Sequence, residues 1–575
     1  MVDLVISEAT KRNWERLNVT DDEIAKKLSH RANKLKSVKK IIPREYFQDK
    51  KNIKKIIPIL ELNIGVEQII YNLALNVLGV NGLIRIDNSV SSENKNIIKF
   101  LNNFGNYELN DYLVNYDLPP EKDILGIIYQ SLMSEGNKNK KGSYYTPDDV
   151  VSRFLPLIKS DTKLLDPCCG TGSFLLTLGD RIENPENIYG FDSDKVACFI
   201  AGVNLLIKYK DKEFYPNIFN CDFLKYETDM RFDLIATNPP WGGVNVEDYS
   251  KIYPEIKSGE NFSYFIVKSE RLLNEDGKCC FVLPVSITNV KTHRDIRRFI
   301  LDNFRIENIT HYGKVFTGVL SDVVSITLEG GKYRGRGKCF NNIKIITDTE
   351  KIISQKVYEE NENNNFTLIG NDDIELLDKI YSVPHTTLKD SVWALGIVTG
   401  NNEKHISLIP EGRERIYTGK NISPYLISET DKYINYDRTK FQQVAPDEIY
   451  RAKEKLVYKF ISKSPVFAYD DEQRLFLNSA NILIPKVETH SVKTVLAFLN
   501  STLFRYIYKT KFGEVKILKG NLMQLPFPYL DEKTKTTLEK YVDRYLKSSD
   551  KDFIEQINKL VNKLFKVGET DLLNV

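Results

Sequence analysis

Four polar side chains stand where a short apolar run of the sequence gives way to turn residues. They are Asp166 in KLLDPCCGTGSF, Asp192 in NIYGFD, Asp222 in NIFNCDF and Asn238 in FDLIATNPPW. The apolar runs alternate with segments of helical periodicity, a pattern that predicts a parallel sheet with helices on both faces. Ligands bind beyond the carboxyl ends of the strands in such sheets, so we expect these side chains to face one site.

The first of these turns contains Gly170 and Gly172, which would let a ligand approach the backbone closely. A nicotinamide-binding fingerprint needs a third glycine where this chain has Leu175, so that class of cofactor is disfavoured. Two glycines are also common in ordinary tight turns, so the loop indicates a ligand site only in combination with the strand ends that follow it.

The next two strand ends supply groups that suit an adenosine. Asp192 follows Gly172 by 20 residues, where a carboxylate can accept hydrogen bonds from both hydroxyls of a ribose. Asp222 adds another acceptor, and Phe223 beside it offers an aromatic wall for an adenine ring. Each aspartate taken singly is more often a helix cap, whereas the series predicts a pocket for an adenosine-containing cofactor.

The fourth strand end reads Asn238-Pro239-Pro240-Trp241 and begins 72 residues after Asp166. In this place and order the motifs resemble those of the gamma-class S-adenosylmethionine-dependent amino-methyltransferases of DNA. The resemblance is strong over residues 143–330 and looser beyond them, where Gly396–Gly400 and Lys519–Asn521 look like the recognition domain of Taq-like adenine methyltransferases. Three further segments carry it: Gly142–Pro147 before the first strand, Phe281–Pro284 as a later strand, and Gly313–Phe316 followed by the strand Val323–Leu328.

The residue types suit such a reaction. An exocyclic amine conjugated to a purine ring is a poor nucleophile, because its lone pair is delocalised. The side-chain oxygen of Asn238 and the carbonyl of Pro239 can each accept one amino hydrogen, which localises that lone pair. Alignment and electrostatics then suffice for attack on a methyl sulfonium. Trp241 and Phe316 would sandwich the base, each stack contributing about 1–3 kcal/mol.

The resemblance implies a Rossmann-like α/β fold with a seven-stranded methyltransferase sheet, S-adenosylmethionine as cofactor, and no metal. Thr146 would contact the cofactor carboxylate, and the turn from Asp166 would lie near its methionine moiety. The implied catalytic residues are Asn238, Pro239, Pro240 and Trp241. The implied cofactor contacts are Tyr145, Thr146, Pro147, Asp166, Pro167, Gly170, Gly172, Asp192, Asp222, Phe223 and Asn238.

Two features depart from the pattern of the family. Trp241 replaces the commoner tyrosine or phenylalanine after the two prolines, which changes the stacking area and keeps the aromatic role. Cys168 and Cys169 occupy the glycine loop where small residues are usual, and we assign them no redox function.

The expected activity is that of a site-specific DNA adenine-N6 methyltransferase. The target atom is shielded inside duplex DNA, so the adenine must be flipped out of the helix. Three alternatives stay open: a modification subunit of a multi-subunit restriction complex, an RNA or protein N-methyltransferase, and a catalytically silent DNA-binding protein. We expect double-stranded DNA as partner, a separate cognate restriction endonuclease as a further one, and a monomer.

Charge is concentrated near the N-terminus. Residues 31–58 carry ten basic side chains against Glu45 and Asp49, a local excess larger than the net charge of +3 of the whole chain. The segment is either a solvated helix face or a surface that contacts phosphates. Its basic residues are Arg31, Lys34, Lys36, Lys39, Lys40, Arg44, Lys50, Lys51, Lys54 and Lys55.

A length of 575 residues is too great for one core, which predicts two or three domains. We expect a basic helical region over 1–142, a catalytic domain over 143–332, a connecting segment over 333–384, and a mixed α+β target-recognition domain with C-terminal helices over 385–575. Candidates for DNA contact in loop-like stretches of that last part are Arg413, Arg415, Lys420, Lys463 and Lys519.

Composition narrows the class of protein without naming a partner. Hydrophobic residues make up 42% and charged residues 28%, as in ordinary globular proteins. The sequence has no apolar run near 18 residues, and its N-terminus lacks a signal peptide's basic start and apolar core. Seven cysteines without CxxC spacing fit neither a disulfide framework nor a zinc finger. We therefore expect a cytoplasmic protein that is not associated with a membrane.

Overall fold

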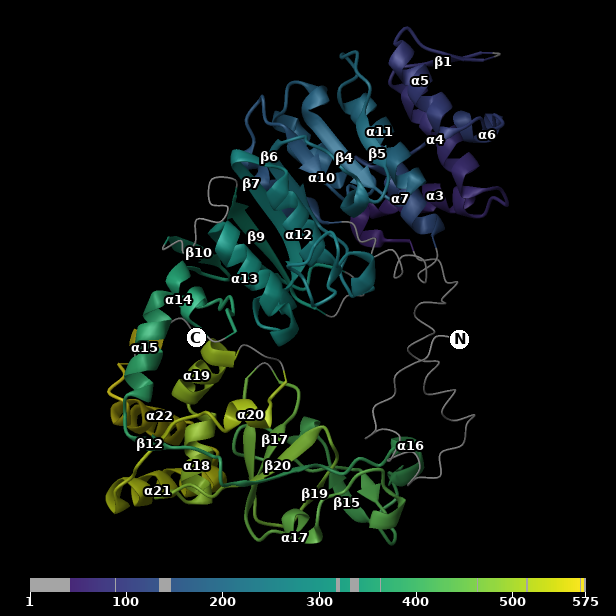
Figure 1. Cartoon of the computed structure of the whole chain (residues 1–575). Helices are drawn as coiled ribbons and strands as arrows, with labels where there is room; N and C mark the ends of the chain where they lie inside the picture. Colours follow the sequence, from purple (N-terminus) through teal and green to yellow (C-terminus); the bar gives the residue numbers. More distant parts are fainter. Residues whose placement is uncertain are drawn as a thin grey trace. The chain divides into compact units, whose positions relative to one another are not determined.

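The structure is a computed structural model of the chain (Figure 1). It describes residues 42–87, 89–133, 146–316, 321–330, 341–361, 363–462, 464–512, 516–568 and 570–572. These residues form two compact units, with the boundary between Gly370 and Asn371. No helix in the described ranges is long and apolar enough to cross a membrane.

A nine-stranded mixed sheet is the centre of the N-terminal unit, in the order β11-β10-β8-β9-β7-β6-β3-β4-β5. Its five strands from β7 to β5 are parallel, and β9 runs antiparallel to both of its neighbours. The apolar runs of the sequence form these strands, which confirms the expected α/β methyltransferase-like sheet. The strands are β3 (Leu164–Asp166), β4 (Ile188–Asp192), β5 (Asn217–Asn220), β6 (Phe232–Thr237), β7 (Leu273–Pro284), β8 (Arg305–Gly313), β9 (Val323–Glu329), β10 (Asn342–Ile346) and β11 (Glu350–Ser354).

The sheet has two strands more than the seven that the resemblance implies. Strands β10 and β11 come from residues that the sequence predicts to be part of a connecting segment. Ile343, Ile345 and Ile353 on these strands are fully buried, so their alternation with polar residues was a strand signal. The polar, asparagine-rich stretches on either side obscured that short signal.

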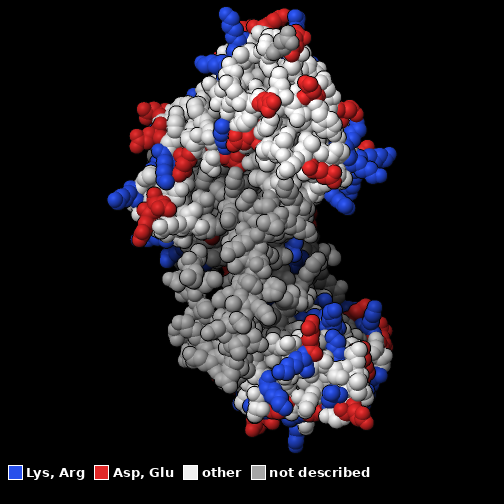
Figure 2. Space-filling view, turned by 90° about the vertical axis from the view of Figure 1, so that its right-hand side faces the viewer, with Lys and Arg blue, Asp and Glu red and all other residues white. Residues whose placement is uncertain are grey.

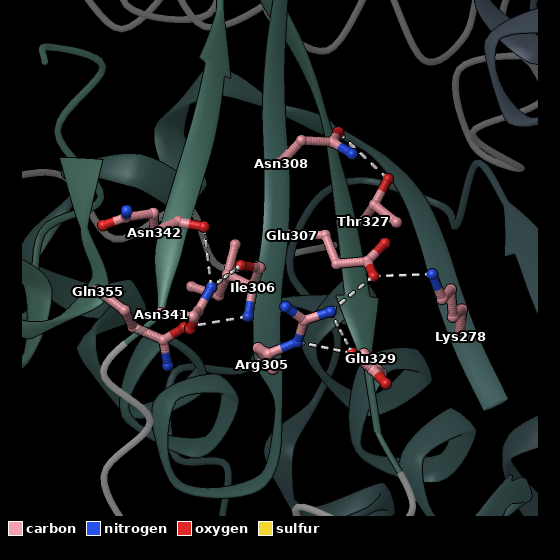
Figure 3. A network of polar contacts seen from close by, with 10 residues as sticks. All are labelled: Lys278, Arg305, Ile306, Glu307, Asn308, Thr327, Glu329, Asn341, Asn342 and Gln355. Carbon is pink, nitrogen blue, oxygen red and sulfur yellow. Dashed lines mark hydrogen bonds and ion pairs between the residues drawn. The ribbon is translucent and has the colours of Figure 1, made fainter. Parts of the chain in front are cut away.

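Side-chain amides fix the added strands to β8 (Figure 3). Gln355, which is fully buried, accepts a hydrogen bond from the backbone N–H of Ile306 at 3.0 Å. Asn341 donates to the Ile306 carbonyl at 2.7 Å. On the other side of β8, Arg305 donates to Glu329 on β9 at 2.6 Å. These contacts join four neighbouring strands at one end of the sheet.

The N-terminal helices share one hydrophobic core with the sheet and do not form a separate body. Figure 1 shows α4, α5 and α7 beside α11. Phe104 on α5 stacks on Phe199 of α11 with ring centroids 3.9 Å apart. The helices of this unit are α3 (Ile53–Leu60), α4 (Val66–Val80), α5 (Lys95–Phe104), α6 (Asp111–Val114), α7 (Ile124–Leu132), α9 (Asp148–Val151), α10 (Ser173–Leu178), α11 (Lys195–Lys208), α12 (Asn261–Arg271), α13 (Arg294–Asn303) and α14 (Gln355–Glu360), with the hairpin β1 (Arg85–Ile86) and β2 (Val90–Ser91).

Only part of the basic N-terminal segment lies within the described residues. Arg44, Lys50, Lys51, Lys54 and Lys55 are exposed there, and Lys55 forms an ion pair with Asp117 at 2.7 Å. The other five basic residues of the segment lie outside the described ranges. Figure 2 shows acidic and basic side chains intermingled on the described surface of that view. The phosphate-contacting interpretation of this segment stays a prediction.

The C-terminal unit contains two four-stranded sheets, in the orders β13-β20-β17-β18 and β14-β16-β15-β19. They are built from β13 (Val392–Leu395), β14 (Ile406–Ser407), β15 (Glu414–Tyr417), β16 (Tyr433–Ile434), β17 (Lys455–Lys459), β18 (Phe467–Asp470), β19 (Leu475–Phe476) and β20 (Ala480–Ile484), and β12 (His385–Thr386) pairs with β21 (Phe527–Pro528). The helices are α15 (Asn371–Tyr381), α16 (Asn402–His405), α17 (Asp447–Tyr450), α18 (Val492–Asn500), α19 (Thr502–Phe512), α20 (Lys519–Leu522), α21 (Glu532–Ser548) and α22 (Asp552–Leu564). The last two are the amphipathic helices expected at this end of the chain.

Candidate active site

The candidate site lies at the carboxyl ends of the parallel strands, where the order of the chain through the sheet reverses. From β3 the chain continues outward through β4 and β5, and then returns to add β6 on the other side of β3. Such a switch point opens a crevice between neighbouring strands, because their following loops turn in opposite directions. A cavity of about 530 Å³ lies here, lined by residues from the ends of β3, β4 and β6.

Most of the residues predicted from the sequence meet in this cavity. Those that line it are Thr146, Asp166, Pro167, Gly170, Asp192, Asp222, Phe223, Asn238, Pro240 and Trp241. Pro147, Gly172 and Pro239 lie beside these residues in the chain and do not line the cavity. Tyr145 lies outside the described residues. The roles assigned to all of these residues stay predictions.

Asp166 fastens β3 to β6 beneath the cavity. Its Oδ1 accepts hydrogen bonds from the hydroxyl of Thr237 at 2.6 Å and from the backbone N–H of Cys168 at 3.1 Å. Burial, with a smaller contribution from the charge of Asp192, raises the pKa of Asp166 to about 7, although the two hydrogen bonds act to lower it. Burial also raises the pKa of the thiols of Cys168 and Cys169 well above the ordinary value, so both stay protonated.

The glycine loop is held by the carboxylate of Asp192. One oxygen accepts the N–H of Gly170 at 2.9 Å, and the other accepts the N–H of Asp194 at 2.8 Å. Gly170 has φ +51°, and a Cβ added there would meet no atom within 4 Å. The backbone at this point of the cavity wall therefore leaves space for a ligand.

Asn238 presents an unused acceptor at the end of β6. Its amide nitrogen donates to the hydroxyl of Thr146 at 3.1 Å. Its Oδ1 is buried and has no hydrogen-bond partner among the described residues. A buried acceptor without a partner costs about 1–3 kcal/mol, so this oxygen is available to a donor that the described residues do not supply.

Trp241 and Phe316 lie in contact with each other. Their ring centroids are 5.4 Å apart and their planes meet at 75°, an edge-to-face arrangement, and Phe316 is buried. The two rings leave no gap for a third ring between them. The predicted base sandwich therefore requires the rings to separate and reorient.

A buried lysine forms hydrogen bonds with the backbone of the loop that is expected to contact adenine. Asp222 accepts the N–H of Leu224 at 3.0 Å and so begins a short helical turn that carries Phe223. Lys268 on α12 is buried and donates to the carbonyls of Phe223 and Tyr226. Burial lowers the pKa of Lys268 to about 8.

Sequence reasoning missed an entire side of the cavity. Tyr129, Gln130 and Met133 at the end of α7 line it, although the sequence places them in a helical region before the catalytic domain. Tyr249 was missed as well. The available signal was the apolar helix that Asp123 caps, and nothing in its periodicity indicated a ligand.

The candidate DNA-contacting residues all belong to the C-terminal unit. Arg413, Arg415, Lys420 and Lys519 are exposed, and Lys463 lies outside the described residues. Arg413 donates to the carbonyl of Ile409 at 3.2 Å, and Arg415 forms an ion pair with Glu429. Lys519 lies over the ring of Trp393, 6.0 Å from its centroid. Their contacts with DNA stay predictions.

Two protein families match this chain. Residues 120–379 match the family described as N-6 DNA Methylase, and residues 414–527 match the TaqI-like C-terminal specificity domain. The first match includes α7 and the whole cavity-bearing sheet, and the second lies within the C-terminal unit.

Curated relatives agree with these matches. The type II methyltransferase M.VspI of Vibrio sp. (strain 343) is 34% identical over 317 residues, which are 52% of this chain and 75% of the relative. A type I restriction enzyme EcoEI methylase subunit of Escherichia coli is 26% identical over 30% of this chain and 38% of the relative. The chain thus spans well under half of the second relative.

The fold of nearly the whole chain is similar to that of a solved structure. The type IIL restriction-modification enzyme MmeI, in complex with DNA, covers 92% of each chain with a TM-score of 0.55 and 14% sequence identity. At that identity the likeness concerns the fold.

Proposed function

We propose, from the premise that this chain belongs to the family of N-6 adenine DNA methyltransferases of restriction-modification systems, that it methylates N6 of one adenine within a specific DNA sequence. The observation that carries the proposal is the side-chain oxygen of Asn238. It is a buried acceptor without a partner among the described residues, in a residue that lines the cavity.

The chemistry follows from that acceptor. An adenine amine that donates one hydrogen to Asn238 Oδ1 and the other to the carbonyl of Pro239 has its nitrogen lone pair localised and directed away from both acceptors. The hydroxyl of Thr146 holds the Asn238 amide by its nitrogen at 3.1 Å, which fixes the direction of the oxygen. Positioning supplies the catalysis, and no strong base is required.

The cavity suits S-adenosylmethionine, which supplies a methyl group on an electrophilic sulfonium when bound. The open backbone at Gly170 would lie against the methionine moiety. Asp192 and Phe223 both line the cavity, where the carboxylate would contact the ribose hydroxyls and the ring would lie against the adenine.

The target adenine must leave the duplex to reach Asn238, because N6 is engaged in base pairing and is shielded inside the duplex. Trp241 and Phe316 would receive it after giving up their contact with each other. The specificity-domain match over residues 414–527 supports sequence recognition by this same chain. We keep residues 143–332 as the proposed catalytic domain and 385–575 as the proposed recognition domain.

The specificity-domain match also disfavours one of the alternatives left open, the modification subunit of a multi-subunit complex. A modification subunit of a multi-subunit complex depends on recognition from a separate subunit, whereas this chain matches a specificity domain over 114 consecutive residues. We therefore favour an enzyme that finds its own site, with a restriction endonuclease as a separate partner.

The test is methylation of unmethylated genomic DNA by the purified chain with S-adenosylmethionine, read as N6-methyladenine by mass spectrometry and located by sequencing. We expect methyl groups at one short sequence and their loss in Asn238→Ala. Asn245→Ala, which alters an exposed asparagine outside the cavity lining, is the matched control and should methylate normally. Full activity of Asn238→Ala would contradict the proposal.

A further inference from the structure

We propose that Asp123 is a positioning residue of the cofactor site, and that α7 thereby acts as its fixed wall. The inference rests on the proposed function, because it takes the cavity to be the site of S-adenosylmethionine. Asp123 precedes the glycine loop by more than 40 residues and does not itself line the cavity. Its carboxylate nevertheless holds the residue between the two glycines.

Three elements meet on the Asp123 carboxylate, which is 4% exposed. Its Oδ2 accepts a hydrogen bond from the hydroxyl of Thr171 at 2.5 Å. Its Oδ1 accepts the N–H of Gly126 at the start of α7, at 2.9 Å, and the amide of Asn204 on α11, at 2.8 Å. Asn204 also donates to the backbone carbonyl of Thr171 at 3.0 Å. Thr171 is thus held through both its side chain and its backbone.

Thr171 lies between the two glycines and has the side chain through which this part of the loop is held. Gly170 and Gly172 on either side have φ of +51° and +96° and carry no side chains that could anchor them. Glycines lose the most conformational freedom on ordering, so a loop that contains two of them needs external support. Asp192 at the end of β4 holds the loop by the N–H of Gly170, and Asp123 at the start of α7 holds it by the hydroxyl of Thr171.

The approach of α7 to the loop is close enough to exclude any side chain at its third residue. A Cβ added to Gly126 would lie 2.1 Å from Asp123 Oδ2 and 2.6 Å from the hydroxyl oxygen of Thr171. Glycine at this position is therefore required by the contact between helix and loop, and any larger residue would push them apart.

The same helix holds a second cofactor-facing segment. Tyr129 donates its hydroxyl to Asp194 at 2.7 Å, and Asp194 in turn caps α11 through the N–H groups of Val196 and Ala197. Tyr129 and Asp194 both line the cavity. One helix thus fixes the loop after β3 through Asp123 and the loop after β4 through Tyr129.

If α7 only packed against the core, apolar side chains would suffice and a buried carboxylate would not be needed at Asp123. Burial raises the pKa of Asp123 to about 6 even though the hydrogen bonds from Thr171, Asn204 and Gly126 act to lower it. Those donors all belong to segments that must keep a fixed geometry for a ligand to bind. Coupling between a ligand and the elements that hold its site is reciprocal, so the bound cofactor must also stabilise the start of α7.

The test measures S-adenosylmethionine binding by calorimetry in Thr171→Val, which removes the donated hydroxyl while keeping the shape, and in Thr171→Ser, which restores it. We expect the valine variant to bind about tenfold more weakly and the serine variant to bind like the wild type. Thr177→Val is the matched control, because Thr177 is buried in α10 and does not line the cavity. DNA affinity without cofactor should stay the same in all three variants.

Hydrogen exchange on the unaltered protein gives a second readout that no folding defect can disturb. We expect S-adenosylmethionine to slow exchange at the Gly126 and Ile127 amides of α7 as well as in the glycine loop. Protection of the loop alone, or equal binding by Thr171→Val and the wild type, would overturn the inference. If the wild type binds no S-adenosylmethionine, the proposed function fails and this inference falls with it.

Discussion

At the scale of single residues, the site is defined by which hydrogen-bonding groups the chain satisfies and which it leaves open. Thr237 and the Cys168 N–H satisfy one oxygen of Asp166, whereas the Asn238 oxygen is left without a partner among the described residues. Closely similar strand ends thus serve different purposes. Asp166 maintains the sheet, and Asn238 is available for a substrate.

Thr146 tests how far the direction of the Asn238 oxygen matters. Thr146→Val removes the acceptor of the Asn238 amide and lets that side chain rotate, so we expect kcat to fall about tenfold or more with little change in the KM for DNA. Single-turnover methylation of a duplex substrate measures this. Thr146→Ser should restore the rate, and an unchanged kcat in the valine variant would contradict the role given to the contact.

The raised pKa of Asp166 makes the free energy of unfolding depend on pH. The folded-state pKa of Asp166 is raised to about 7 from an ordinary 3.8, so the folded protein binds the carboxyl proton more tightly than the unfolded chain does. The contribution of Asp166 to the free energy of unfolding therefore declines as pH rises from about 4 to 7. Asp166→Asn keeps an acceptor for both donors without the charge. Relative to this variant, the wild type should lose at most roughly 4 kcal/mol of unfolding free energy between pH 4 and pH 8. Denaturant titrations across that range measure the difference, and parallel pH profiles would refute it.

At the scale of elements, the order of strands places the site, and the sequence predicts this part well. Each strand of the parallel set was visible as an apolar run with a polar end, so Asp166, Asp192, Asp222 and Asn238 could be predicted to meet. The contribution of α7 could not be predicted, because an amphipathic helix with a capping aspartate has the same appearance whether or not its end faces a cavity. Strands β10 and β11 were missed because they are short and lie between polar stretches.

The added strands provide a test at this scale. Gln355→Ala removes a buried side chain that bonds the backbone of β8, leaving the Ile306 N–H without its partner, and we expect a loss of about 1–3 kcal/mol of unfolding free energy. Chemical denaturation measures that loss. Lys356→Ala, at an exposed neighbouring position of α14, is the control and should change stability by less than about 0.5 kcal/mol. Equal effects of the two substitutions would show that the amide does not fix β11 to the sheet.

At the scale of the whole molecule, the described residues form two units with separate hydrophobic cores, and the proposed function assigns methyl transfer to one unit and sequence recognition to the other. The cavity belongs to the N-terminal unit, and the specificity-domain match belongs to the C-terminal unit. The net charge of +3 does not reveal this division, because it is a sum over parts of the chain that differ in charge.

A buried ion pair in the C-terminal unit allows the two activities to be separated. Lys455 and Asp470 are both fully buried and lie 2.5 Å apart. Asp470→Asn leaves the lysine without its counter-ion, which should destabilise this unit by about 3–5 kcal/mol. We expect loss of site-specific DNA binding with unchanged S-adenosylmethionine affinity, measured by fluorescence anisotropy and calorimetry. Glu472→Gln, at an exposed position nearby, should alter neither. Weakened cofactor binding in Asp470→Asn would show that the units are not independent.

The contact between Trp241 and Phe316 also bears on which adenines can react. A base that is to lie between these rings competes with an intramolecular partner, and a tethered neighbour has an effective concentration far above that of any free nucleoside. Only an adenine delivered by a DNA segment already held by the protein reaches a comparable local concentration. If Trp241 and Phe316 receive the base as proposed, the closed aromatic pair would discriminate against adenosine, ATP and other dissolved purines.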